Sequence, residues 1–295
     1  YKGFNNQIDR NVLSLYMQYM YVPTPYSIFK DVYKLEPGYI LQVDESGRTR
    51  PIEKITSSVF SAQGVSIKQW YSLSSVAKRN QNNLIEDEDE AIELLEKTLL
   101  ESVQSQLISD VPLGAFLSGG IDSSMIVGLM NKISSHPVKT FTIGFEESAF
   151  NEAIYAKEVA KHLGTDHHEL YVTASDAFEV IPSLHTIYDE PFADSSQIPT
   201  YLVSKLARQH VTVALSGDAG DELFGGYNRY LWGERVWSKL KWIPPIMRQT
   251  LGTAIQKLPA STWDAAGYLL PNKYKVASMG DKAHRMSYRL KTVNS

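Results

Sequence analysis

Residues Leu113-Gly-Ala-Phe-Leu117 run directly into Ser118-Gly119-Gly120-Ile121-Asp122-Ser123-Ser124, and this stretch decides the fold of the chain. An apolar run of strand length passes into two glycines flanked by hydroxyl residues. Apolar residues then recur at helical spacing, at Met125, Ile126, Leu129, Met130 and Ile133. The pattern predicts a strand, a loop and a helix in direct succession.

The loop between strand and helix has the features of a phosphate cradle. The first amides of a helix have no partner within the helix, and the positive end of the helix dipole lies there, so an anion is stabilised. Gly119 and Gly120 leave room for a phosphate, and Ser118 and Ser123 add hydroxyl donors. A simpler interpretation stays open, in which Ser118 caps the helix and Asp122 complements its first turn.

Three better-known loops are excluded by their spacing. The chain contains no Gly-x-x-x-x-Gly-Lys-Ser/Thr nucleotide loop and no Gly-x-Gly-x-x-Gly dinucleotide loop. Neither Ser118 nor Ser216 has the glycine two residues earlier that a Gly-x-Ser-x-Gly hydrolase elbow requires. A phosphate loop of another kind remains.

Composition narrows the class of protein. The 295 residues are 43% hydrophobic and 21% charged, as in ordinary globular proteins, and contain no cysteine. Disulfides, cysteine-ligated metals and a cysteine nucleophile are therefore absent from this chain. No apolar run has the length of a membrane span, no secretory pattern opens the chain, and a cytoplasmic protein is expected.

Charge gives no case for nucleic-acid binding by the chain as a whole, since the net charge is −4. From Glu234 onward, eleven Lys and Arg stand against three Asp and Glu. We interpret this basic part as the solvated faces of helices, although a contact with polyanions or a membrane surface stays open. Neither a nucleic acid nor a membrane is expected as a partner.

The remaining periodicity predicts an α/β fold. Strands are expected at 138–145, 168–172 and 211–215, and helices at 87–109, 122–134, 151–163, 174–188 and 195–208. Alternating helices and apolar strands indicate a doubly wound parallel sheet covered on two sides. Before it we expect a helix at 9–20, a β-hairpin that begins at 39–43 and turns at 44–47, and a polar linker at 72–90.

A second loop, Ser216-Gly217-Asp218-Ala219-Gly220-Asp221-Glu222, follows the last strand. Ligands of parallel sheets lie at the carboxyl ends of the strands, so both loops are expected at one edge. Mg²⁺ with a polyphosphate takes oxygen ligands from one or two acids, and Asp122 and Asp221 are the candidate metal ligands. A solvated turn with helix-capping acids is the alternative for the second loop taken alone.

These loops resemble those of a known family. Ser118-Gly-Gly-Ile-Asp-Ser123 resembles the pyrophosphate loop of the N-type ATP pyrophosphatases, and 215–227 resembles the second loop of the asparagine synthetase family. Phe141-Thr-Ile-Gly144, 162–169 and 189–196 agree with that family, and the resemblance is strongest over 90–230. The resemblance implies an adenine nucleotide alpha hydrolase-like fold with a helical C-terminal extension.

The resemblance implies a ligase that makes an amide in two steps. ATP and Mg²⁺ activate a carboxylate as an acyl-adenylate with loss of pyrophosphate, and ammonia, which glutamine supplies in the full-length protein, then displaces AMP. By resemblance, pyrophosphate is held by residues 118–123, among them Ser118, Gly119, Gly120, Asp122 and Ser123. Adenosine and the α-phosphate are surrounded by Leu117, Ile143, Ser216 and Gly217. Mg²⁺ is bound by Asp122 and Asp221. Asp218 stands where many members carry Glu, in the role of proton acceptor from the ammonia nitrogen.

Residues 21–25 and 34–38 are similar to the last part of a glutamine amidotransferase domain. The resemblance therefore implies a remnant of that domain at 1–75, a linker at 76–88, the synthetase domain at 89–232 and its basic helical extension at 233–295. It also implies that the chain is a fragment of a longer protein, because the catalytic cysteine of the amidotransferase domain is not among these residues. A homodimer is left open.

One departure from the family concerns the substrate. At 194–199 the asparagine-forming members carry Thr and Arg residues that grip aspartate, whereas Ser195 stands in place of the arginine. L-aspartate is the expected substrate. Another carboxylate, such as a sugar acid or a β-amino acid, and a nucleotide-binding fragment without turnover remain the alternatives.

Overall fold

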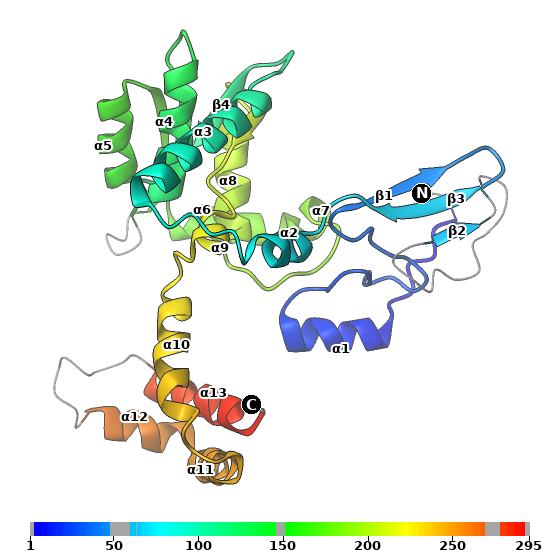
Figure 1. Cartoon of the computed structure of the whole chain (residues 1–295), viewed down its shortest axis with the longest axis vertical. Helices are drawn as coiled ribbons and strands as arrows, with labels where there is room; N and C mark the ends of the chain where they lie inside the picture. Colours follow the sequence, from blue (N-terminus) through cyan, green and yellow to red (C-terminus); the bar gives the residue numbers. More distant parts are fainter. Residues whose placement is uncertain (1–2, 48–59, 63, 146–150, 269–277, 293–295) are drawn as a thin grey trace. The chain divides into compact units, whose positions relative to one another are not determined.

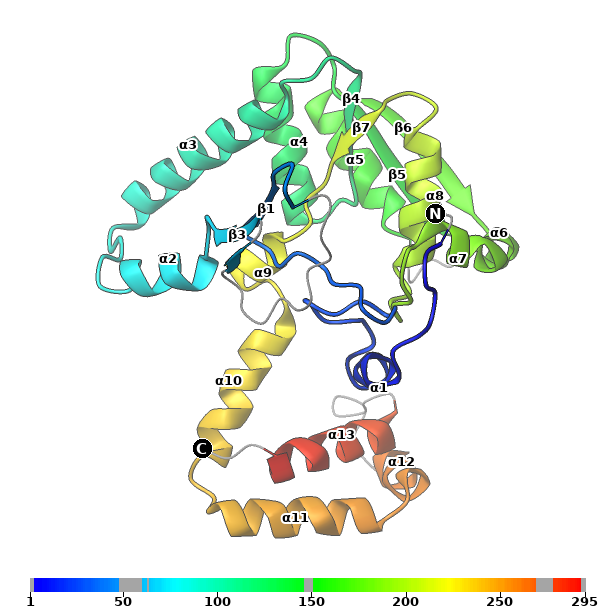
Figure 2. The same cartoon turned by 90° about the vertical axis from the view of Figure 1, so that its right-hand side faces the viewer.

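The computed structural model describes residues 3–47, 60–62, 64–145, 151–268 and 278–292. The chain forms two compact units, Tyr1–Asp218 and Ala219–Ser295, whose elements are labelled in Figure 1 and Figure 2. The first unit holds all the described strands, and the second is helical.

The first unit contains a parallel sheet of four strands in the order β6-β5-β4-β7 (Figure 2). The strands are β4 (Leu113–Phe116), β5 (Lys139–Phe145), β6 (Asp166–Val172) and β7 (Val213–Leu215). Helices α4 (Ile121–Ile133) and α5 (Ala153–Leu163) carry the chain outward from β4 through β5 to β6. The chain then returns through α8 (Gln197–Ala207) and places β7 on the other side of β4.

Both faces of the sheet are covered, as the apolar strands predict. On one face, β4 packs with α3 (Glu88–Gln106), α4 and α5 in a cluster that includes the fully buried Ala115, Val127 and Ala156. On the other face, Phe141 of β5 packs with Ala207 and Val211 at the end of α8. The predicted doubly wound α/β fold is confirmed, although the edge strand β7 leaves Val213 exposed.

The N-terminal part of this unit contains one helix and an antiparallel sheet of three described strands. Helix α1 (Arg10–Tyr19) confirms the helix expected at 9–20, and the Asp9 side chain caps it. Strand β1 (Tyr39–Val43) pairs antiparallel with β3 (Val65–Gln69), which also pairs with β2 (Phe60–Ala62). The predicted turn is present, since the Asp44 carboxylate accepts from the amides of Ser46 and Gly47. Residues 48–59, directly after that turn, lie outside the described part.

Two further elements depart from the sequence prediction. Helix α2 (Leu73–Asn80), capped by Ser72, occupies the start of the stretch that we expected to be a linker. The single helix expected at 174–188 is broken into α6 (Ala174–Val180), a 3₁₀ turn (Ile181–Ser183) and α7 (Leu184–Ile187). Pro182 lies in the turn, and proline lacks the amide that would continue the α-helical ladder.

The second unit consists of α9 (Gly220–Phe224), α10 (Asn228–Leu240), α11 (Pro245–Lys257), α12 (Ala260–Tyr268) and α13 (Met279–Thr292), which confirms a helical C-terminal region. Helix α13 packs on α11 and α12. A Cβ at Gly252 would lie 2.7 Å from the Ser287 carbonyl oxygen, so a small residue is required where α11 meets α13.

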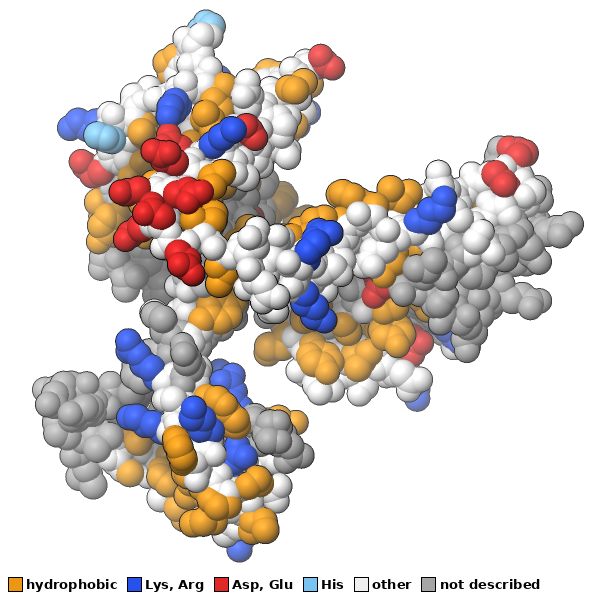
Figure 3. Space-filling view, viewed as in Figure 1, with side chains coloured by type: hydrophobic (Ala, Val, Ile, Leu, Met, Phe, Trp, Pro, Cys, Tyr) orange, Lys and Arg blue, Asp and Glu red, His pale blue; other side chains and the backbone are white. Residues whose placement is uncertain are grey.

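Charge is unevenly placed along the chain. Acidic side chains gather at the start of α3 (Figure 3), where Asp87 caps the helix and Glu88, Asp89 and Glu90 lie in its first turn. They complement the positive end of the helix dipole, so this acidic patch has a structural explanation.

Candidate functional site

The candidate site lies where the winding of the sheet reverses. Strands β4 and β7 are neighbours, with Leu113 opposite Val213 and Ala115 opposite Leu215. The chain leaves β4 toward β5 on one side and reaches β7 on the other. In open α/β sheets this switch point is where loops separate and a ligand enters. The two predicted loops follow the carboxyl ends of these two strands.

The first loop is held close to its neighbours by its backbone. Leu117, only 1% exposed, donates its amide to the Phe141 carbonyl of β5. Gly119 has φ +78°, and a Cβ there would lie 2.7 Å from the Ala156 amide nitrogen. Only glycine combines that conformation with that approach.

The structure separates the two interpretations of Ser118. The N-cap of α4 is Gly120, which offers no side-chain acceptor to the first turn, so Ser118 does not cap the helix. The Ser118 hydroxyl lies 2.9 Å from the hydroxyl of Ser123 and accepts weakly from the Gly120 amide at 3.3 Å. The first amides of α4 therefore have no side-chain cap, and Asp122 lies in that first turn.

The Ser123 side chain makes two hydrogen bonds to the backbone of the first loop. Its side chain is buried, and its oxygen accepts the Ser118 amide at 3.2 Å and donates to the Gly120 carbonyl at 3.3 Å. The neighbouring Ser124 hydroxyl donates to the same carbonyl at 2.7 Å. These bonds tie both ends of the loop together at the start of α4.

The second loop touches the first within the same unit. A Cβ at Gly217 would lie 2.6 Å from the Ser123 nitrogen and 2.9 Å from the Asp122 carbonyl carbon. The backbone of Gly217 thus lies against the first turn of α4, nearly a hundred positions earlier in the chain. Ser216 donates its hydroxyl to the Asp218 carboxylate at 3.0 Å, which orients that carboxylate.

Two predicted site residues lie farther from this contact. Ile143 is a half-buried residue of β5 that packs with Val172 and Leu202 near the carboxyl edge. Asp221 belongs to the second unit, in the first turn of α9, where its backbone carbonyl accepts the Gly226 amide at 3.0 Å. The pairing of Asp122 with Asp221 at a metal therefore stays a prediction. Among the described residues, no three His, Cys, Asp or Glu side chains converge on a metal position.

A third segment at this edge is the loop before α8. Helix α8 runs back to the start of β7, so its own start lies at the carboxyl edge of the sheet. The Asp194 carboxylate accepts the Ser196 amide at 2.9 Å, and hydrogen bonds from the Ser196 backbone and side chain hold the pKa of Asp194 below its usual value. Ser195 is exposed between them. Sequence reasoning singled out Ser195 but not the contacts that hold this loop, which involve residues far away in the chain.

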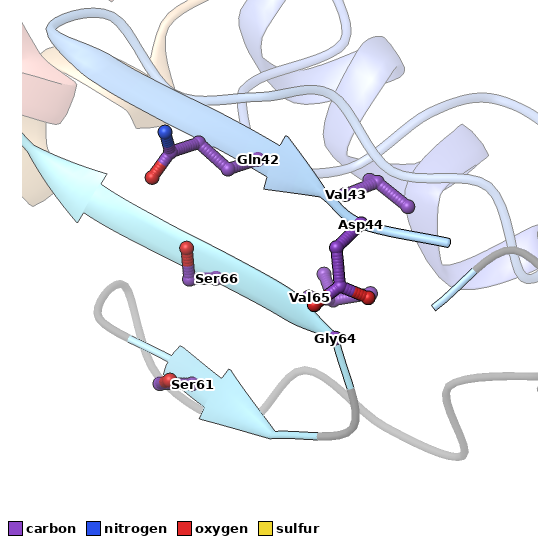
Figure 4. Close-up of a pocket in the computed structure, with 7 residues that line it drawn as sticks. All are labelled: Gln42, Val43, Asp44, Ser61, Gly64, Val65 and Ser66. Atoms are coloured by element: carbon purple, nitrogen blue, oxygen red, sulfur yellow. The ribbon is translucent and has the colours of Figure 1, made fainter. Parts of the chain in front are cut away.

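Two cavities in the described part of the chain lie away from these loops. One of about 460 Å³ is bounded by β1, β2 and β3 (Figure 4) and contains a single charged side chain, Asp44. Its carboxylate already accepts from Ser46 and Gly47. The other, of about 380 Å³, borders α1. Neither combines a phosphate loop with acids.

Histidines cluster at the opposite, amino edge of the sheet. The rings of His168 and His210 stack with centroids 3.9 Å apart, and His167 lies 2.8 Å from the Thr140 hydroxyl. Burial lowers the pKa of His167, although the carboxylate of Glu169 acts in the opposite direction. These contacts explain the histidines as packing residues.

Comparison with known proteins shows the family of the chain. Residues 94–293 match the model of the family described as asparagine synthase. The chain belongs to the asparagine synthase family. Within that family, it is 39% identical over 230 residues to a Methanocaldococcus jannaschii protein provisionally named as glutamine-hydrolysing asparagine synthetase 2, covering 78% of this chain and 40% of that protein.

Other asparagine synthase relatives give the same result. Glutamine-hydrolysing asparagine synthetase 1 of Bacillus subtilis is 36% identical over 225 residues, covering 76% of this chain and 32% of the relative. Asparagine synthetase B of Escherichia coli is 37% identical over 151 residues, covering 45% of this chain and 26% of the relative. The chain thus spans at most 40% of the length of these relatives.

Among solved structures, the NH₃-dependent NAD synthetase of Campylobacter jejuni overlaps 69% of this chain and 97% of its own, at a TM-score of 0.33 and 11% identity. That overlap is partial. No helix in the described residues is long and apolar enough to cross a bilayer.

Proposed function

We propose that this chain carries the amide-forming site of an ATP-dependent ligase of the asparagine synthetase type. The observation that carries the proposal is the contact of Gly217 with the first turn of α4, which unites two loops at the switch point of the sheet. The family match and the names of the relatives support it.

The proposed reaction activates a carboxylate and then transfers ammonia. A carboxylate oxygen attacks the α-phosphorus of ATP, the bond to the β-phosphate oxygen breaks, and pyrophosphate leaves with an acyl-adenylate formed. Ammonia attacks the acyl carbon, its nitrogen loses a proton, and AMP departs with the electron pair of the acyl–oxygen bond. Activation is needed because hydroxide is a poor leaving group at neutral pH, and the charge developing on pyrophosphate requires donors.

The chain's own residues divide this work. Ser118, Gly119, Gly120 and Ser123, with the uncapped amides of α4, would bind the departing pyrophosphate. Leu117, Ile143, Ser216 and Gly217 would surround adenosine and the α-phosphate. Asp218, held by Ser216, would accept the ammonia proton.

Magnesium fits the donors of the first loop. Asp122 stands in the first turn of α4, directly after the glycine loop, and carboxylate oxygen is the ligand that Mg²⁺ prefers. Asp122 and Asp221 would hold the ion, which when bound would neutralise phosphate charge.

The substrate and the ammonia source complete the proposal. We take L-aspartate as the carboxylate, following the names of the relatives, with another acid as the alternative because Ser195 cannot make the bidentate contact of an arginine. Glutamine is the proposed source of ammonia in the whole protein; the 295 residues contain no thiol for attack on its amide.

The test measures AMP and pyrophosphate release with ammonia, ATP, Mg²⁺ and a panel of carboxylic acids. Stoichiometric AMP with aspartate supports the proposal, AMP with another acid alone changes the substrate, and nucleotide binding without turnover overturns it. Asp122→Asn should abolish most turnover. The matched control is Asp110→Asn, the same substitution at a residue that precedes the amino end of β4.

A further inference from the structure

The loop 189–196 is held by a part of the chain more than 150 residues away. The Glu190 carboxylate accepts the Ile28 amide at 2.7 Å on one oxygen and the Lys34 ammonium at 2.8 Å on the other. The side chains are 21% and 35% exposed for Glu190 and Lys34. Both oxygens of one carboxylate are thus occupied by donors from the N-terminal segment, and charge-assisted bonds of this kind are stronger than neutral ones.

The donors are themselves fixed before they meet Glu190. The Lys34 ammonium also donates to the Val22 carbonyl at 2.6 Å, and the Lys34 amide bonds the Pro25 carbonyl at 2.8 Å. Val22 and Ile28 are almost fully buried, at 4% and 5% exposure. Residues 20–34 therefore form a preorganised holder, which we call the N-terminal clamp.

A second contact joins the same two segments. The Ala193 amide donates to the Met20 carbonyl at 2.7 Å. The loop is thus tied at 190 and again at 193, immediately before the exposed Asp194 and Ser195. Burial would raise the pKa of Glu190, but the bonds from Lys34, Ile28 and Ser27 outweigh it and hold that pKa below its usual value. The carboxylate is therefore ionised at neutral pH.

The tied loop leads into the candidate site. It connects α7 to α8, and the first turns of α8 pack with Ile143 and Val172 at the carboxyl edge of the sheet. A shift of the loop would carry Asp194 and Ser195 with it relative to that edge. Many ion pairs only stabilise a fold; this one ties the residues next to a candidate substrate-binding segment to a separate part of the chain.

We propose that Glu190 is a positioning residue, through which the N-terminal clamp sets the 189–196 loop for binding of the carboxylate substrate. The inference rests on the proposed function for the identity of that substrate. The nucleotide loops follow β4 and β7, whereas the tied loop follows α7. Release of the clamp should therefore weaken binding of the carboxylate and leave binding of ATP unchanged.

The test replaces Glu190 by Gln in the full chain. Glutamine keeps the size of the side chain and can accept the Ile28 amide, but its NH₂ group then faces the Lys34 ammonium, donor against donor. The matched control is Glu96→Gln, which removes a carboxylate charge from an exposed ion pair of 2.6 Å with Lys132, between α3 and α4. Lys34→Met should reproduce the effect of Glu190→Gln, and Lys34→Arg should retain most of the wild-type behaviour.

Two measurements decide the inference independently of each other. Hydrogen exchange at the Ala193 amide should be at least several-fold faster in Glu190→Gln than in wild type and unchanged in Glu96→Gln. Steady-state kinetics with L-aspartate, or with whichever acid the wild type uses, should show a KM for that acid raised about tenfold, with the KM for ATP within twofold.

Two results would overturn the inference, and a third would overturn the proposed function alone. Wild-type exchange at Ala193 in Glu190→Gln overturns the inference, because the clamp then does not hold the loop. An unchanged carboxylate KM beside faster exchange also overturns it, because the contact is then only structural. If the wild type turns over no carboxylate at all, the proposed function fails, whereas the exchange experiment still decides whether the clamp holds the loop.

Discussion

Replacement of Gly217 by alanine tests the contact on which the proposed function depends. The added Cβ would lie 2.6 Å from the Ser123 nitrogen, 2.9 Å from the Asp122 carbonyl carbon and 3.0 Å from the Ser123 Cα. Gly217 is not among the glycines with positive φ, so the conflict is one of space and not of backbone conformation. All three neighbours are backbone atoms, which cannot rotate out of the way.

The size of the effect follows from these distances. The shortest contact must open from 2.6 Å to the 3.4 Å of ordinary van der Waals contact, so the two loops must separate by about 0.8 Å. Overpacking of this kind destabilises a protein by about 1–3 kcal/mol. A displacement of about 1 Å at a reacting centre can lower the rate roughly 100-fold. We therefore expect a modest loss of stability and a much larger loss of turnover.

The assay compares pyrophosphate release at saturating ATP with urea unfolding of the same samples, at a temperature where each variant is folded. Gly128→Ala is the control: it lies in α4, a Cβ added there would have no neighbour within 4 Å, and alanine in a helix is about 1 kcal/mol more favourable than glycine. If Gly217→Ala turns over within twofold of wild type, close approach of the loops is not needed, and the proposal loses its main support.

Three further predictions concern single side chains. Ser123→Ala should lower the free energy of unfolding by about 1–3 kcal/mol, because the Ser118 amide loses its acceptor; an unchanged urea midpoint would contradict this. Asp122→Asn should raise the Mg²⁺ concentration for half-maximal pyrophosphate release by about tenfold or more, whereas an unchanged Mg²⁺ dependence would exclude it as a ligand. Burial lowers the pKa of His167 in the folded chain below the ordinary histidine value of 6.5. Below pH 6.5 the unfolded chain therefore binds more protons than the folded chain. Wild-type stability should therefore fall as pH drops from 6.5 to 5, His167→Gln should show a flatter profile, and equal slopes would refute the assignment.

The sequence predicted the core of the fold because the signal there is local. The strand at 113–117 follows from a short continuous apolar run, and the helix at 122–134 follows from apolar residues at helical spacing. The structure has them as β4 and α4, within one residue at each end. The glycine loop between them was likewise predictable, since few backbones other than a tight turn need two adjacent glycines. The family resemblance is confirmed by the match over 94–293.

What the sequence did not predict depends on contacts between distant residues. β1 pairs with β3, and no local pattern specifies that register. The helix break at Pro182 could have been predicted from the proline, but it was missed because the apolar spacing continues through that position. The bond of Lys34 to Glu190 joins two ordinary charged residues 156 positions apart, and neither has a local feature that names its partner.

The position of the site follows from the path of the chain more than from any single motif. Crossovers between parallel strands are right-handed, so successive strands added on opposite sides of β4 place their helices on opposite faces. The helix clusters on the two faces of the sheet agree with this. The loops after β4 and β7 consequently have no crossover helix between them, and the first turn of α4 remains open to the backbone of Gly217. A side chain at 217 would close that opening, and for this reason we expect activity to depend on glycine there more than on any hydroxyl of the loop.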